Sequence, residues 1–69
     1  MIPPERVAIV RQREHDVVIT LGTQRGRQVT QRGKLYAHGA YWEQELGPML
    51  YALGYTIVLP SGERLAGVP

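Results

Sequence analysis

The stretch VVITL at residues 17–21 decides the fold, because its side chains alternate between two faces. Val17, Ile19 and Leu21 fall on one face of an extended chain. Val18 and Thr20 fall on the other face. A period of two is the pattern of a β-strand that buries one side, so we predict a strand at 17–21.

The residues before this strand predict its partner. Branched side chains in VAIVRQR, residues 7–13, favour a strand. Glu14, His15 and Asp16 then form a short polar break. Two strands with a short polar link are typical of an antiparallel hairpin, so we expect 7–13 and 17–21 to pair.

The residues after VVITL are polar and rich in glycine. We expect a turn from Gly22 to Gly26, because glycine takes positive φ at little cost. Residues 27–32 predict a polar third strand, which suits a sheet edge because its charges discourage aggregation. Gly33 ends that strand, and Lys34–His38 is a candidate for a short fourth strand.

Residues 40–53 carry the helical pattern of the chain. Gly47-Pro48 interrupts it, so we expect a kink there or a short helix that restarts at Pro48 as its N1 residue. Gly54 stands where a left-handed C-cap is expected. The apolar stripe has the spacing of one helix face and consists of Trp42, Leu46, Met49, Leu50 and Leu53.

The C-terminal residues predict a second hairpin. Residues 55–59 alternate as a strand, 60–63 read as a turn, and 64–66 return as a short strand. The expected fold class is therefore α+β: a small antiparallel β-sheet built from a hairpin or meander, then one kinked helix on one face, then the C-terminal hairpin. A small open barrel is the alternative. We expect one domain, residues 1–69.

The chain has 69 residues and no cysteine. Disulfides and cysteine-based zinc sites are thus excluded. A chain this short buries little apolar surface, so regular packing or self-association must supply stability. A homodimer is therefore an open alternative.

Composition and hydropathy place the chain among globular proteins. Hydrophobic residues make up 43% and charged residues 20%. No run of about 18 apolar residues exists to span a membrane, and the N-terminus lacks a signal-peptide pattern. We therefore expect a cytoplasmic protein with no membrane partner.

Charge is divided unevenly along the chain. Residues 1–34 hold seven of the eight Arg and Lys and three of the six acids, a net charge of +4. Residues 35–69 hold Arg64 against three acids, a net charge of −2. The basic half indicates an anionic partner. The alternative is that two complementary faces only solvate the fold or pair in a homodimer.

The sequence contains no clear catalytic constellation. The neighbours of His15 point to the side opposite its own side chain in an extended segment, so Glu14 and Asp16 do not complete a triad or a metal cluster. His38 shares a strand face with Tyr36, an arrangement that could cleave RNA without a metal but that is also an ordinary amphipathic strand. We expect no enzyme activity, no cofactor and no metal.

Basic and amide side chains on the predicted first and third strands favour nucleic-acid binding. Arginine suits phosphate, glutamine suits base edges, and a two- or three-stranded sheet can enter the major groove. Tyr36 is the single aromatic residue near the basic region, so duplex DNA or structured RNA fits better than stacking on a single strand. The predicted contact residues are Arg11, Arg13, Arg25, Arg27, Arg32, Lys34 and Tyr36.

The sequence TQRG occurs twice within this region, seven residues apart. Seven is odd, so the two copies on a strand face opposite sides unless a bulge intervenes. We expect Arg25 and Arg27 on one side and Arg32 and Lys34 on the other.

Protein binding is the alternative function. A small cysteine-free domain without a catalytic constellation is typical, by size and composition alone, of phage- or plasmid-type accessory regulators and inhibitors that block a host protein complex. Trp42 belongs to the apolar stripe and is expected in the core. Tyr41 and Tyr51 lie off the stripe and are candidates for a partner or dimer surface.

Overall fold

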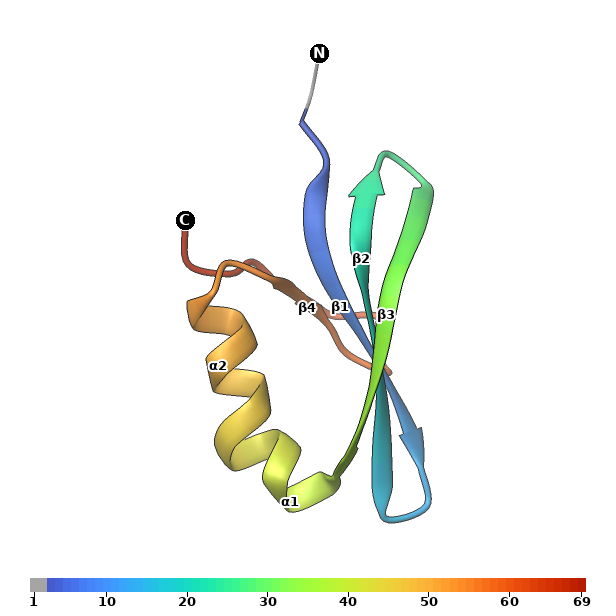
Figure 1. The fold of residues 1–69 in the computed structure, drawn as a ribbon, viewed down its shortest axis with the longest axis vertical. Coiled ribbons are helices and arrows are strands. Elements are labelled where there is room, and N and C mark those ends of the chain that lie inside the picture. The colour runs from blue at the N-terminus through green and yellow to red at the C-terminus, as the bar shows by residue number, and fades with distance from the viewer. Residues whose placement is uncertain (1–2) are drawn as a thin grey trace.

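The computed structural model describes residues 3–69 and confirms the α+β fold, with a five-stranded sheet and one helix on one side of it (Figure 1). The strand order is β3-β2-β1-β4-β5, which places the polar strand β3 at an edge as expected. The strands are β1 (Glu5–Arg13), β2 (Asp16–Arg25), β3 (Gln28–His38), β4 (Thr56–Val58) and β5 (Arg64–Leu65).

The sheet is mixed, because β4 pairs with β1 in parallel. The first three strands form an antiparallel meander, so β3 runs in the same direction as β1. The helix that follows β3 returns the chain to the far side of β1, where β4 starts in that same direction. β5 then completes the expected C-terminal hairpin with β4.

The two N-terminal hairpins are longer and tighter than predicted. The turn expected from Gly22 to Gly26 is wrong: β2 continues to Arg25, and only Gly26 and Arg27 form the loop. The first loop likewise has two residues, beginning at Glu14. The φ values of Gly26 and Glu14 are 62° and 55°, whereas the second residue of each loop has no positive φ, and a positive φ at the first loop residue alone distinguishes type II′ from type I′ turns.

β3 contains one residue more than β2 opposite it. Leu21 pairs with Gly33, whereas the next residue of β2 pairs with Gln31. Arg32 is therefore the extra residue of a β-bulge. The predicted strand break at Gly33 is wrong, because the ladder absorbs the irregularity and continues as one strand to His38.

The bulge decides which side chains of β3 face the helix. After it, Leu35 pairs with Ile19, a core residue. Before it, Thr30 pairs with Thr23, which shares the face of Ile19 because β2 runs without a slip against β1. Lys34 consequently points to the opposite side. We call the side that carries Ile19 the helix face and the other side the open face.

The helix face carries the hydrophobic core. The core is made by strands β1, β2 and β4 together with the helix, and its buried members are Ala8, Val10, Val17, Ile19, Trp42, Leu46, Leu50 and Ile57.

No helix within residues 3–69 is long and apolar enough to cross a membrane.

The helix runs from residue 39 to 52 and contains one π-helical turn immediately before Pro48. It consists of α1 (Gly39–Tyr41), the π turn η1 (Trp42–Leu46) and α2 (Gly47–Ala52). The N–H of Gly47 donates to the carbonyl of Trp42, five residues back. The expected restart at Pro48 is wrong, because the helix continues without a break and α2 begins at Gly47. Pro48 lies in the first turn of α2, where its missing donor costs little.

The π turn also rotates the apolar stripe. An α-helix turns about 100° per residue, so one extra residue in a turn rotates every later side chain backwards about the helix axis by about that angle. Leu50 is thereby brought into line with Trp42 and is buried. The predicted stripe is wrong at Met49 and Leu53, which rotate outward and are 48% and 56% exposed. Trp42 is buried as expected.

Gly54 ends the helix as expected, with a φ of 91°. Its N–H donates to the carbonyl of Tyr51, and the N–H of Tyr55 donates to that of Leu50. These two bonds form a Schellman motif. The tail returns to the same end, because the N–H of Val68 also donates to the Tyr51 carbonyl.

The bulge provides a matched pair of glycine substitutions. A Cβ at Gly22 would overlap the carbonyl of Thr30, whereas a Cβ at Gly33 meets nothing within 4 Å. We expect Gly22→Ala to lower the free energy of unfolding by about 3 kcal/mol or more, because backbone cannot move aside as a side chain can. Gly33→Ala should change it by no more than about 0.5 kcal/mol. Urea unfolding of both variants measures this, and equal stabilities would contradict the described bulge.

Candidate nucleic-acid interface

Arg6 is committed to holding the helix in place. Its guanidinium donates to the carbonyl of Leu53 at the end of the helix, where the macrodipole favours a cation. The same guanidinium carbon lies 5.0 Å from the centroid of the Tyr55 ring. Arg6 therefore joins β1 to the C-terminal end of α2.

Arg64 is committed to joining the sheet edge at β5 to its centre. It donates to Oε1 of Glu5 at 2.6 Å and to Oε1 of Gln24 at 3.1 Å. The other carboxylate oxygen of Glu5 accepts from the hydroxyl of buried Thr56 at 2.9 Å. One carboxylate thus satisfies a buried hydroxyl and an arginine on neighbouring strands.

The other six basic side chains make no contact of this kind in the described part of the chain. Within residues 3–69 none of them makes a side-chain hydrogen bond or an ion pair, and all are exposed. The six are Arg11, Arg13, Arg25, Arg27, Arg32 and Lys34.

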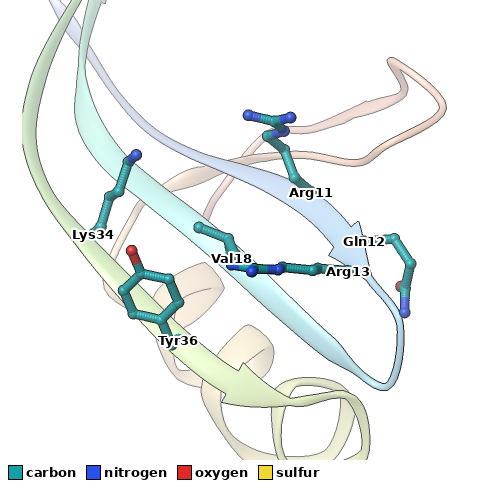
Figure 2. A pocket seen from close by; sticks show the side chains of 6 residues that line it. All are labelled: Arg11, Gln12, Arg13, Val18, Lys34 and Tyr36. Atoms are coloured by element: carbon teal, nitrogen blue, oxygen red, sulfur yellow. The ribbon is translucent and has the colours of Figure 1, made fainter.

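Three of these cations gather on the open face around a tyrosine, as Figure 2 shows. Arg11 and Arg13 come from β1, and Lys34 and Tyr36 come from β3. Val18 of β2 forms the floor between them, because it pairs with Arg11 on one side and with Tyr36 on the other. We call Arg11, Arg13, Lys34 and Tyr36 the open-face cluster; they line a shallow hollow of about 400 Å³ with Val18 and Gln12.

Tyr36 stands out in this cluster because its side chain is 68% exposed. Its ring extends from the edge strand over the open face, beside Val18 (Figure 2). In the described part of the chain, residues 3–69, no helix covers this side of the sheet (Figure 1). An aromatic ring among cations offers a stacking surface next to groups that bind phosphate.

Two further cations lie on the helix face, at the end of the β2–β3 hairpin that the helix leaves uncovered. Arg25 and Arg32 line one hollow of about 290 Å³ together with Thr23, Gln28 and Thr30. We call these five residues the hairpin cluster. Its side chains combine guanidinium groups with hydroxyl and amide groups, which suit phosphates and base edges respectively.

The expected division of the arginines is wrong. The sequence predicted that Arg25 and Arg27 act on one side and Arg32 and Lys34 on the other. Instead, the bulge turns Arg32 away from Lys34 and places it beside Arg25. Arg27 belongs to neither cluster, because it lies in the two-residue loop at the tip of the hairpin.

The histidines have different surroundings. His15 lies in the first hairpin loop, and its carbonyl accepts from the N–H of Gly39. His38 ends β3, and its Nδ1 accepts from the N–H of Ala40, so the ring caps the helix. Residues 3–69 contain no group of three or more His, Asp or Glu side chains placed to hold a metal ion.

Comparisons of the chain with protein-family models, with curated proteins and with solved structures gave no match. The sequence predicts all members of the open-face cluster and, in the hairpin cluster, both arginines and the amide side chain of Gln28. It does not predict Thr23 and Thr30 as their companions, because the pairing of these two residues depends on the two-residue loop of the hairpin.

Basic residues that make side-chain contacts and basic residues that make none should differ in their effect on stability. Arg6→Ala removes a charge-assisted hydrogen bond and a contact with an aromatic ring, so it should lower the free energy of unfolding by about 1–2 kcal/mol. Arg27→Ala removes the same charge from a loop and should change it by less than about 0.5 kcal/mol. Thermal and urea unfolding would measure both, and a similar loss in the two variants would refute the assignment.

Proposed function

We propose that this protein is a small non-enzymatic binding protein whose basic β-surface contacts nucleic acid. The observation that carries the proposal is that six of its eight basic side chains are exposed and make no hydrogen bond or ion pair in the described part of the chain. A phosphate backbone offers a dense row of negative charges, and releasing its counterions makes such contacts favourable.

The surroundings of these cations support nucleic acid over a small anion. They spread over two strand faces and a hairpin tip instead of converging on one point. Glutamine and threonine side chains accompany them in the hairpin cluster, and Tyr36 accompanies them on the open face. This mixture of charge, amide and aromatic groups is the mixture that contacts phosphates and bases.

The remaining parts of the proposal follow the sequence. No cofactor or metal is assigned to the protein, and we place it in the cytoplasm, where nucleic acid is accessible. A homodimer stays a prediction; light scattering after size-exclusion chromatography would measure the mass of the protein in solution.

Salt dependence of binding tests this function. The logarithm of the association constant for duplex DNA should fall linearly with the logarithm of salt concentration, with a slope of about −0.9 for each phosphate contacted. Engagement of all six cations would give a slope of about −5. Fluorescence anisotropy with labelled DNA would measure it, and an absence of binding at low salt would remove the proposal.

A triple variant locates the binding surface. Arg25→Ala, Arg27→Ala and Arg32→Ala together should make the slope shallower by about 2.7 while leaving the unfolding transition in place. The matched control is a variant with the same change in net charge on the helix and the distal turn, Ala40→Glu, Gln44→Glu and Ser61→Asp, at three exposed positions. An equal effect of both variants would indicate net charge alone instead of a binding surface.

A protein-binding regulator or inhibitor is the second candidate, and an apolar groove favours it. Between the helix and the C-terminal hairpin lies a hollow of about 270 Å³ lined by Trp42, Pro48, Tyr51 and Leu65, among others. Tyr51 is exposed there, as the sequence predicted. Large aromatic side chains beside an apolar groove are typical anchors of protein interfaces.

Affinity capture separates the two functions. The protein is used as bait in a host lysate treated with nuclease, beside a Tyr51→Ser variant and the triple arginine variant. Protein binding predicts a partner that survives nuclease and is lost with Tyr51→Ser but kept with the arginine variant. A partner lost with nuclease supports the nucleic-acid function.

A further inference from the structure

We infer that the β2–β3 hairpin enters the major groove of B-form DNA edge first, so that the two basic clusters contact the phosphate backbones on the two sides of the groove. This inference rests on the proposed function and specifies its ligand: duplex DNA instead of a single strand or an RNA duplex. It is carried by the placement of the two clusters on opposite faces of the sheet, each with a basic residue on the edge strand β3.

The edge strand carries cations on both of its sides. Arg32 and Lys34 are two residues apart on β3, and side chains two apart on a regular strand would share a face. Because of the bulge they lie on opposite faces, Arg32 beside Arg25 and Lys34 beside Arg11. A single-stranded ligand lying across one face would leave one of these groups unused.

The edge strand β3 is accessible and can enter a groove. It is the outermost strand of the sheet, and in Figure 1 its hairpin tip projects at the end of the sheet remote from α1. A sheet with its side chains is about 10 Å thick, and the major groove of B-form DNA is about 12 Å wide. The hairpin therefore fits the groove edge first.

The depth of the major groove matches the spacing of the strands. The major groove is about 8.5 Å deep, and neighbouring strands lie about 4.8 Å apart. With β3 at the floor, β1 lies about 10 Å further out, at the level of the phosphates. Arg11 and Arg13 of β1 would then contact one backbone, and Arg25 of β2 together with Arg32 would contact the other.

In this orientation, amide and hydroxyl groups occupy the part of β3 nearest the base pairs. Gln28 and Thr30 point to one side and Gln31 to the other, and all three are exposed. Such groups donate to and accept from base edges in the major groove. The deep, narrow major groove of an RNA duplex excludes a β-hairpin, which sets the two duplexes apart.

Binding of three probes by two double variants tests the inference. The probes are a short DNA duplex, one of its strands alone, and the RNA duplex of the same sequence. The variants are Arg11→Gln with Arg13→Gln, and Arg25→Gln with Arg32→Gln. A control with the same charge change is Gln44→Glu with Ser61→Asp, at two exposed positions.

The inference predicts that the DNA duplex binds most tightly and that each double variant makes its salt slope shallower by about 1.8, with additive effects when combined. A single strand or RNA duplex bound as tightly as the DNA duplex would overturn it, as would an effect confined to one variant; in both cases the proposed function stands. A protein that binds none of the three probes loses the proposed function as well.

A crosslinking experiment reads the orientation directly. The chain contains no cysteine, so Gln31→Cys provides a unique attachment point for a photoreactive group on the edge strand. Crosslinks to bases, suppressed when the major groove is blocked by a bulky base modification, are expected. Gln44→Cys on the helix is the matched control and should give none. Crosslinking from the helix position instead would overturn the inference.

Discussion

The close approach of two backbones at Gly22 is the constraint on which the sheet depends. No side chain fits between this residue and the carbonyl of Thr30, so the hairpin closes there only with glycine. The extra residue Arg32 sits next to that contact. Beyond it, Leu35 and Ala37 reach the core; before it, polar residues take the same face. One irregularity thus joins an apolar half of a hairpin to a basic half.

The helix uses the same device in another geometry. The π turn before Pro48 adds one residue to a helix, as the bulge adds one to a strand. The additions differ in effect, because a strand alternates by 180° and an α-helix advances by about 100° per residue. Gly47 permits the second one: a Cβ there would lie 2.9 Å from the Trp42 carbonyl. Both insertions are built around glycines.

These two insertions mark the limit of what the sequence can predict. Strand and helix types were predictable because period and turn residues are local signals, and the fold class followed from them. The direction of the side chains after each insertion was not predictable, so the predicted positions of Met49 and Arg32 are wrong. In sequence, Gly22 and Gly33 are alike; only the tertiary approach of Thr30 distinguishes them. Arginines are equally alike, yet Arg6 and Arg64 have partners 47 and 59 positions away.

The parallel pairing of β4 with β1 also governs the order of folding. The meander of β1, β2 and β3 has only short loops to close, so it forms from local contacts. Val7 finds Thr56 only after the helix has crossed over, and such long-range closure is the slow step in chains of this kind. Until then the second edge of β1 is open to other chains. Arg6 and Arg11 flank the apolar run of that strand at residues 7–10, and charges at such positions discourage pairing of the nascent edge with other chains.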